Sequence, residues 1–165
     1  MLRARVTKWF IALVTQAFIF GGLAQAECSG PPSTRSHLVD RGHEVYDTET
    51  DLTWAKCSVG MKWVGGKCIG VATLGSWAQA NEAKWPDGWR VPSLEELQTI
   101  VATNCKNLAI DESMFPKTTL WYWTTRKETA SRCWFVSFYD GEPYNGYRDR
   151  SCDLIGAVRL VRGGQ

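Results

Sequence analysis

The segment from Gly88 to Leu97 constrains the fold of this chain more than any other part of the sequence. It reads Gly-Trp-Arg-Val-Pro-Ser-Leu-Glu-Glu-Leu. Pro92 disfavours the helical conformation at Val91, so a helix cannot begin before Ser93. Ser93 and Glu96 have the spacing of a capping box, in which each side chain binds a backbone N–H at the helix start. The segment therefore predicts a fixed structural node, with Arg90 as a buried hydrogen-bonding strut, and not a reaction centre.

The first 26 residues have the pattern of an export signal. Arg3, Arg5 and Lys8 precede an apolar stretch over 11–20, and Ala24-Gln25-Ala26 forms a small-x-small cleavage site. The apolar stretch is too short to span a bilayer well, and Cys28 has no convincing lipobox before it. We therefore expect a signal peptide over 1–26, no stable membrane span after its cleavage, and a protein that is secreted, periplasmic or at the cell surface.

Removal of the signal changes the charge balance. About 139 residues remain, with 16 Lys and Arg against 17 Asp and Glu. This balance gives no global attraction for nucleic acid, so no nucleic-acid partner is predicted. The length suits one domain with one core. We expect an N-terminal lead over 27–43, loose from Ser29 to Ser36, followed by one domain over 44–165.

All six cysteines lie in the exported part, and their even number predicts disulfides. The ribbon around Gly65-Gly66 predicts a Cys57–Cys68 bridge, because the two cysteines flank a short hairpin. Cys133–Cys152 would close the last large loop, which leaves Cys28–Cys105 by elimination; the sequence keeps other pairings of these four open. No Cys-x-x-Cys pair exists, and neither histidine has a ligand spacing with a cysteine, so no metal site is predicted.

The order of the predicted elements is strands, helices and strands again. Leu94, Leu97, Ile100 and Val101 share one helical face and predict core packing. The predicted elements are a hairpin over 44–47 and 52–57, the Gly-Gly ribbon, a helix capped by Ser76 that ends near Trp85, a helix from Leu94 to about Thr103, and strands over 120–125, 132–138 and 157–162.

Eight tryptophans follow the signal, which is far above ordinary usage. Most lie within strand or helix patterns, so we expect them chiefly to fill the core of a small, loop-rich domain. The alternative is that some of them form a stacking platform for sugar rings.

Taken in order, these segments resemble the family of the Legionella collagen-like protein C-terminal domain (the Lcl C-terminal domain), long catalogued as a domain of unknown function. The resemblance covers roughly residues 44 to 165. The segments that carry it are Val45-Tyr46-Asp47-Thr48 with 52–57, Gly60-Met61-Lys62-Trp63 to Cys68, Gly88-Trp89-Arg90-Val91-Pro92 with Glu96-Leu97, Ile110-Asp111 with Phe115-Pro116, Tyr122-Trp123-Thr124-Thr125, 134–138 and 157–165.

The resemblance implies an α+β fold of the C-type-lectin-like class. Two helices would pack on a small, twisted, mostly antiparallel sheet beside a long irregular loop region, with disulfide bonds. It also implies an exported bacterial protein, and members attached to surface proteins are associated with adhesion and with polyanionic glycans. The chain has no collagen-like repeat. We expect the structural residues of this fold to be Trp54, Gly88, Trp89, Arg90, Pro92, Ser93, Glu96, Trp123 and Trp134.

The polar stretch over 139–153 is the predicted ligand-binding loop, because tyrosines beside adaptable polar side chains are typical of binding loops on rigid scaffolds. A Cys133–Cys152 bridge would pre-order it. The partner would be a glycan or a surface protein, and Arg126, Lys127, Arg132, Arg148 and Arg150 could gather to bind an anionic glycan. The candidate binding residues are Tyr139, Asp140, Glu142, Tyr144, Asn145, Tyr147, Arg148, Asp149 and Arg150.

Two further functions stay as alternatives. Glu142-Pro143-Tyr144-Asn145 resembles the Glu-Pro-Asn triplet of calcium-dependent lectins, but Tyr144 interrupts it, so we expect no cofactor and keep calcium as the alternative. The broad fold also hosts formylglycine-generating oxidases and iron-dependent sulfur oxidases. The chain has only His37 and His43, and neither has a neighbouring nucleophile that would make a catalytic dyad. We therefore predict a non-catalytic, adhesin-like binding domain, with a structural or assembly component of the cell envelope as the alternative.

Overall fold

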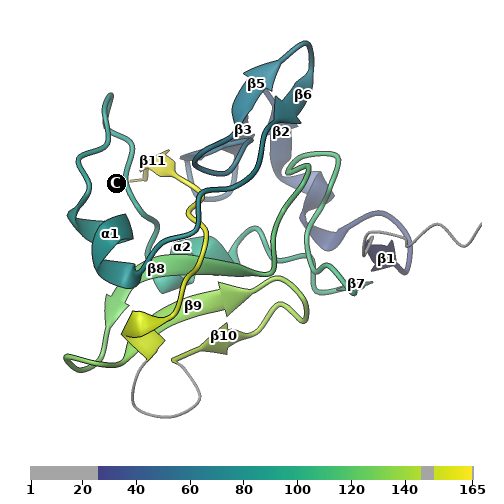
Figure 1. Ribbon diagram of the computed structural model, residues 1–165. Coiled ribbons are helices and arrows are strands. Elements are labelled where there is room, and N and C mark those ends of the chain that lie inside the picture. Colours follow the sequence, from purple (N-terminus) through teal and green to yellow (C-terminus); the bar gives the residue numbers. More distant parts are fainter. Residues whose placement is uncertain (1–25, 146–150, 165) are drawn as a thin grey trace, which may run out of the picture.

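The computed structural model describes residues 26–145 and 151–164. These residues form an α+β fold with four small antiparallel sheets and two short α-helices (Figure 1). Three disulfides cross-link them. The predicted export signal, apart from Ala26, lies outside the described residues. In the described part of the chain, no helix is both long enough and apolar enough to cross a membrane.

The largest sheet has four strands in the order β11-β4-β3-β2. Its strands are β2 (Leu38–Asp40), β3 (Glu44–Asp47), β4 (Leu52–Ala55) and β11 (Val161–Gly163). The predicted hairpin is confirmed as β3 and β4, although β4 ends at Ala55. The last strand begins at Val161 and not at Ala157, which forms only an isolated bridge to Tyr122. Val45, Trp54 and Val161 alternate toward the core and are fully buried.

Both helices begin as their sequences predict. Helix α1 (Trp77–Glu82) and helix α2 (Leu94–Gln98) each start with a complete capping box. Helix α2 was expected to reach Thr103, but it ends at Gln98. The β-branched run that follows favours a helix less, and the Ala102 N–H donates to the carbonyl of Ala109 at 2.9 Å instead of continuing the helix. Ile100 and Val101 are buried all the same.

A three-stranded sheet separates two clusters of core side chains. It has the order β10-β9-β8, formed by β8 (Trp121–Lys127), β9 (Cys133–Ser137) and β10 (Pro143–Tyr144). On one face of the sheet, Tyr122 and Val136 pack in the main core with Leu97 and Ile110. The other face carries Trp123 and Phe135. This alternation confirms the predicted faces of both long strands.

The remaining elements are short pairs and turns at the periphery. Strands β1 (Glu27–Cys28) and β7 (Cys105–Lys106) pair antiparallel, as do β5 (Lys62–Val64) and β6 (Lys67–Ile69). Two 3-10 turns, η1 (Ser33–Ser36) and η2 (Ser151–Asp153), complete the fold. The disulfides join Cys28 to Cys105, Cys57 to Cys68 and Cys133 to Cys152, the pairs that the sequence suggested.

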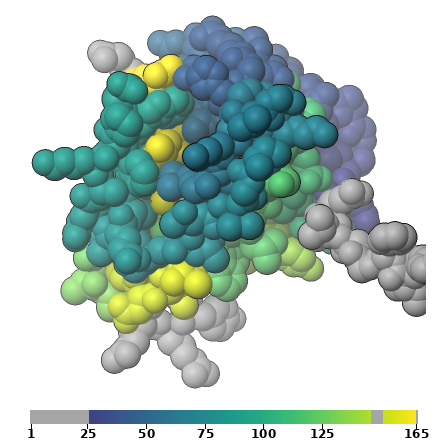
Figure 2. All heavy atoms as spheres, turned by 45° about the horizontal axis from the view of Figure 1, so that its top comes forward, coloured from purple at the N-terminus to yellow at the C-terminus, as the bar shows by residue number. Residues whose placement is uncertain are grey.

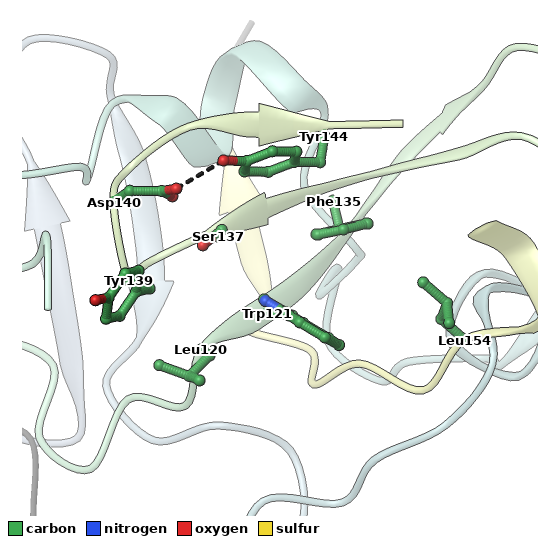
Figure 3. A pocket seen from close by; sticks show the side chains of 8 residues that line it. All are labelled: Leu120, Trp121, Phe135, Ser137, Tyr139, Asp140, Tyr144 and Leu154. Carbon is green, nitrogen blue, oxygen red and sulfur yellow. Dashed lines mark hydrogen bonds between the residues drawn. The ribbon is translucent and has the colours of Figure 1, made fainter. Parts of the chain in front are cut away.

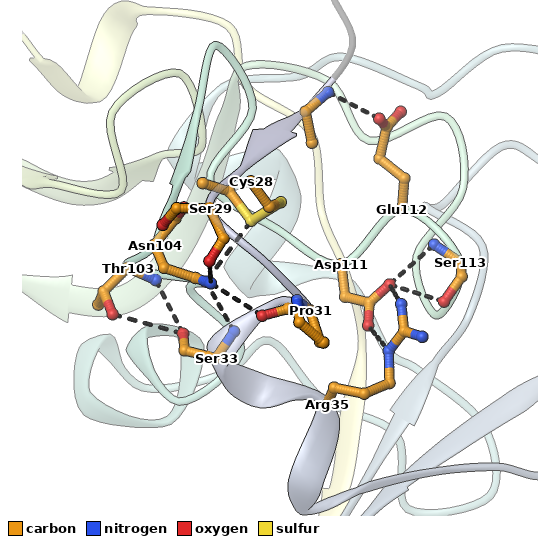
Figure 4. Close-up of a disulfide and its surroundings, with 12 residues drawn as sticks. Cys28, Ser29, Pro31, Ser33, Arg35, Thr103, Asn104, Asp111, Glu112 and Ser113 are labelled. Atoms are coloured by element: carbon orange, nitrogen blue, oxygen red, sulfur yellow. Dashed lines mark hydrogen bonds and ion pairs between the residues drawn. A yellow bond between two sulfur atoms is a disulfide. The ribbon is translucent and has the colours of Figure 1, made fainter.

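The lead is not loose, and that expectation is wrong. Strand β2 forms the edge of the four-stranded sheet, and the Cys28–Cys105 bridge fixes β1 against β7. The Asn104 side chain accepts the Ser33 N–H at 2.7 Å and donates to the Pro31 carbonyl at 2.8 Å (Figure 4). These bonds hold the lead along its length.

The lead also supplies partners to buried charges of the domain. The carboxylate of Asp111, only 1% exposed, receives a forked pair of bonds from Arg35 (Figure 4). The fully buried Asp47 lies 2.9 Å from the Nδ1 atom of His37. The buried ammonium of Lys56 pairs with Asp40. Without the lead, Lys56 would lose its carboxylate partner, and Asp47 and Asp111 would keep only neutral donors such as the Glu49 N–H and Ser113. Burying a charge without a charged partner is costly.

The Gly88–Leu97 node joins helix α2 to strand β11. The Glu96 carboxylate closes the capping box with Ser93 and also receives both terminal nitrogens of Arg90, each at 2.6 Å. Burial raises the pKa of Glu96, but the bonds from Arg90 and Ser93 outweigh it and lower the pKa overall. Arg90 also donates to the Gly163 carbonyl at 3.2 Å. Arg90 therefore forms the hydrogen-bonding strut that the sequence predicts. Its side chain is half-exposed, however, and not buried as expected.

The tryptophans are less buried than expected. Only Trp54 and Trp123 are fully buried. Five others are half-buried at the surface, and two of them, Trp89 and Trp134, lie beneath the guanidinium groups of Arg162 and Arg126. Trp121 is 44% exposed. Packing in the core therefore accounts for only two of the eight tryptophans that follow the signal, and cations lie over the rings of several others.

Replacing Arg35 tests the role of the lead in stability. We expect Arg35→Leu to lower the free energy of unfolding by about 2–3 kcal/mol, because Asp111 would stay buried without its cationic partner. Urea denaturation of the mature protein measures this change. Arg35→Lys, which keeps the cation, should lose less. Equal stability of Arg35→Leu and the wild type would contradict this account of the lead.

The same pair predicts a change in the pH dependence of stability. In the wild type, burial raises the pKa of Asp111, but the bonds from Arg35 and Ser113 lower it overall. This contribution to stability is therefore present above the unfolded pKa of about 3.9 and is lost as the pH falls below it. Arg35→Leu removes the largest of the bonds that lower the pKa of Asp111, so this pKa rises in the variant, and the stability deficit of the variant should shrink as the pH falls from 7 to 3. A deficit that stays constant over this range would contradict the assignment.

Candidate functional site

A pocket of about 480 Å³ opens on the outer face of the β8–β9–β10 sheet (Figure 3). Its walls come from the start of β8, the middle of β9, the turn before β10 and the segment after η2. Its lining is largely apolar and aromatic, which is typical of ligand sites. The lining residues are Leu120, Trp121, Phe135, Ser137, Tyr139, Asp140, Tyr144 and Leu154.

Cross-strand pairing brings the aromatic rings of this face together. Phe135 pairs in register with Trp123 on one side and with Tyr144 on the other. Its ring stacks on Tyr144 at 5.8 Å between centroids, meets Trp123 edge-on at 5.8 Å, and lies 5.7 Å from Trp121. These are the separations that aromatic pairs prefer. Phe135 therefore forms the floor of the pocket, and the rings of Trp121 and Tyr144 are fixed beside it.

The rim of the pocket leaves large apolar groups open to solvent. Trp121 is 44% exposed, Tyr139 56% and Leu154 39%. Leu120 and Trp121 also line a smaller depression of about 150 Å³ that continues to Ile155. A contiguous exposed apolar surface of this kind marks a binding site more often than scattered single residues do.

The Cys133–Cys152 disulfide holds the far rim. It connects β9 to η2, and the Cys133 N–H donates to the Ser151 hydroxyl at 2.8 Å beside it. Leu154 follows directly after η2 and so takes its place on the pocket wall.

A glycine sets the turn that carries Tyr139 and Asp140. Gly141 has φ +80°, and a Cβ atom there would lie 2.7 Å from the Val101 side chain and 3.2 Å from that of Ala109. The Gly141 N–H donates to the Ser137 carbonyl at 2.7 Å. Only glycine combines this conformation with so close an approach to the core. The turn therefore presents its side chains at a fixed position.

Asp140 is the charged group of the pocket. Its carboxylate accepts the Tyr144 hydroxyl at 2.6 Å (Figure 3) and the Glu142 N–H at 3.3 Å. Burial raises the pKa of Asp140, but bonds from Tyr144 and Ser137 outweigh it and lower the pKa overall. The pocket thus combines aromatic faces with an ionised hydrogen-bond acceptor at its rim.

The structure brings three of the predicted binding residues into one pocket, namely Tyr139, Asp140 and Tyr144. Asn145 instead donates to Glu128 at 2.9 Å, and the Glu142 side chain does not line the pocket. Four others, Tyr147, Arg148, Asp149 and Arg150, lie outside the described residues. The sequence did not single out Leu120, Trp121, Phe135, Ser137 and Leu154. Trp121 carried a usable signal, because it opens a strand whose next same-face residue is also a tryptophan.

Among the cations proposed for an anionic ligand, the three that the structure describes, Arg126, Lys127 and Arg132, do not line this pocket. Arg126 pairs with Glu95 and covers Trp134, and Lys127 lies over Trp77. They occupy the end of β8 opposite Trp121, at most about 17–20 Å away along the strand. Arg132 precedes β9 near that same end, while Arg148 and Arg150 are outside the described part of the chain.

The segment that resembles the lectin triplet makes hydrogen bonds of its own. The Asn145 amide nitrogen donates to the Glu128 carboxylate, and the Tyr144 hydroxyl donates to Asp140. Across residues 26–145 and 151–164, no group of three His, Cys, Asp or Glu side chains is arranged to hold a metal ion.

A comparison with known protein families identifies this domain. The family model described as the Lcl C-terminal domain matches residues 43–162, which include every described residue of the pocket. No curated protein matches the chain.

Replacing Tyr144 tests the electrostatics of the pocket. Tyr144→Phe should raise the pKa of Asp140, because it removes the strongest of the bonds that lower it. A carboxyl-carbon NMR titration measures the change. Tyr139→Phe is the matched control, since no hydrogen bond between Tyr139 and Asp140 is found in the described structure, and it should leave this pKa in place. An unchanged pKa in Tyr144→Phe would show that the bond does not act on Asp140.

Proposed function

Since the chain belongs to the Lcl C-terminal domain family, we propose that it is an extracytoplasmic, non-catalytic binding domain with a C-type-lectin-like fold, and that the pocket at Trp121 is its ligand site. Three disulfides are typical of an oxidising compartment outside the cytoplasm. The likeness of fold is supported by two short helices beside small antiparallel sheets and by a long irregular region. The finer location, periplasm or cell surface, is part of the proposal.

The ligand that fits this pocket best is a neutral sugar ring. The C–H groups on one side of a pyranose carry partial positive charge and are attracted to the negative face of an aromatic ring. Trp121 offers such a face at the rim, 44% exposed. The Asp140 carboxylate beside it would accept hydrogen bonds from sugar hydroxyls. The same carboxylate would repel an anionic glycan, so we favour a neutral glycan over the anionic ligand expected from the sequence.

The non-catalytic part of the proposal rests on the state of the cysteines and on the polar groups of the pocket. All six cysteines are in disulfides, so the chain offers no thiol for chemistry of the formylglycine-generating type. The polar side-chain groups that line the pocket are the Asp140 carboxylate, the hydroxyls of serine and tyrosine and the indole N–H of Trp121. The hydroxyls of Tyr144 and Ser137 bond to this carboxylate and lower its pKa, which makes it a weak base for activating either hydroxyl as a nucleophile.

A surface protein is the second candidate ligand, as would suit an assembly component of the envelope. The exposed apolar rim at Leu120, Leu154 and Ile155 favours it, because the core of a protein interface is more apolar than the surface around it. A protein ligand would contact the rim and the adjoining depression, whereas a single sugar ring would contact chiefly Trp121 and Tyr144.

A glycan array probed with the mature protein, followed by titration of the best ligand, tests the proposal. We expect a neutral glycan to bind and Trp121→Ala to weaken its binding at least about tenfold, because the main stacking face is lost. Trp121→Phe keeps an aromatic ring and should lose less. Arg126→Ala, at the far end of β8, should bind like the wild type.

Two outcomes would contradict this function. Selective binding of anionic glycans that Trp121→Ala leaves unchanged would place the site elsewhere. If no glycan on the array binds, and if the chain captures an envelope protein only when Leu120 and Ile155 are intact, a surface protein is favoured as the ligand.

A further inference from the structure

A long acid-free stretch runs through the middle of the chain. From Leu52 to Asn81 the sequence contains no aspartate and no glutamate, although the chain has 17 of these residues. The cations in this stretch are Lys56, Lys62 and Lys67. Lys56 is buried and paired with Asp40, so the exposed charge of the stretch is that of the other two lysines. Neither of them enters an ion pair within the described structure.

These two lysines lie on a two-stranded ribbon, residues 60–71, that we call the basic ribbon. Its register pairs Lys62 with Ile69 and Val64 with Lys67. These four side chains share the outer face, and all four are exposed. Trp63 and Cys68 pair on the inner face, where Cys68 is buried. The outer face therefore presents only cations and aliphatic groups.

The aliphatic groups of the ribbon are unusually open. Val64 is 58% exposed, Ile69 50% and Val71 80%, which makes three of the large exposed apolar residues within eight positions of the sequence. Isolated exposed aliphatic residues need no explanation, but Val64 and Ile69 alternate with lysines on one face, and Val71 lies just after β6. Such a cluster does need an explanation.

The ribbon is held firmly and stands away from the pocket. The Cys57–Cys68 bridge ties its second strand to the segment that follows β4, and the Trp63 ring lies beneath the buried Lys56 ammonium at 4.9 Å. In Figure 1, β5 and β6 form one extremity of the molecule and β9 and β10 the opposite one. In Figure 2 the same end comes forward and lies open at the surface. The basic ribbon can therefore contact a large binding partner while the pocket stays accessible to its own ligand.

We propose that the basic ribbon docks on an anionic phospholipid bilayer. Lysines are attracted to a negatively charged leaflet, and aliphatic side chains between them can enter the interface between headgroups and acyl chains. An anionic glycan would satisfy Lys62 and Lys67 but would offer no apolar phase to Val64, Ile69 and Val71. The combination of exposed lysines with exposed aliphatic side chains therefore favours a bilayer over a soluble polyanion.

Docking in this way gives the domain a defined orientation. The ribbon would rest on the membrane surface, and the pocket at Trp121 would face away from it, toward ligands outside. The inference is independent of the proposed ligand, because no residue of the ribbon lines the pocket.

Vesicle co-sedimentation of the mature protein tests this inference. We expect binding to vesicles rich in phosphatidylglycerol, little binding to phosphatidylcholine alone, and weakening with added salt because charges are screened. Lys62→Gln/Lys67→Gln should weaken binding about 30-fold at low salt. Val64→Ser/Ile69→Ser/Val71→Ser should weaken it as well. Near-UV circular dichroism verifies that each variant keeps its fold.

Two controls separate this site from general charge and from the pocket. Lys84→Gln/Lys106→Gln removes two exposed lysines elsewhere and should bind vesicles like the wild type. Trp121→Ala should also bind them normally, whatever its effect on glycan binding. Absence of vesicle binding would overturn the inference. So would binding that the lysine variant loses but the aliphatic variant retains, since that pattern indicates a polyanion site without insertion.

Discussion

Three disulfides hold the three peripheral segments of this protein on a small core. Cys28–Cys105 fixes the lead, Cys57–Cys68 the basic ribbon and Cys133–Cys152 the far rim of the pocket. The bridges close loops of 77, 11 and 19 residues. In the chain-entropy model, loops of these lengths stabilise the fold by about 3 kcal/mol for the two shorter ones and about 4.5 kcal/mol for the longest. Because a domain of this size is stable by only about 5–15 kcal/mol, its surface features depend on these cross-links.

Buried charge is the second constraint. Arg159 is completely buried, and its guanidinium donates to the Ala55 and Lys56 carbonyls and to Thr118 rather than to a carboxylate. Its flat face lies 4.7 Å from the centre of the Phe115 ring. This cation ties the end of β4 to the segments before β8 and β11. The buried charges of Asp47, Lys56 and Asp111 differ from that of Arg159, because each of them pairs with a titratable side chain of the lead. The lead is therefore part of the folded unit, although most of it precedes the family match at 43–162.

Local sequence rules predicted the elements well where the signal lay within a few residues. The capping boxes at Ser76 and Ser93, the Gly65-Gly66 ribbon and the alternating faces of β8 and β9 all depend on short-range spacing, and the structure contains them. Features that depend on distant contacts were missed. The sequence predicted a loose lead because the bonds that hold it join residues more than 70 positions apart. These bonds are those of Ser33 with Asn104 and of Arg35 with Asp111. The pocket was found in part: Tyr139, Asp140 and Tyr144 stood out as a polar loop, whereas Trp121 and Phe135 resembled core residues. Only the pairing of β8, β9 and β10 shows that their shared face is open.

Hydrogen exchange of a Cys133→Ser/Cys152→Ser variant tests the central claim, that each cross-link supports its own peripheral segment on an independent core. We expect faster exchange confined to β9, β10 and the segment from Ser151 to Gly156, with the amides of β3, β4 and β11 as protected as in the wild type. Faster exchange throughout the four-stranded sheet would contradict the claim, and so would unchanged protection around the pocket.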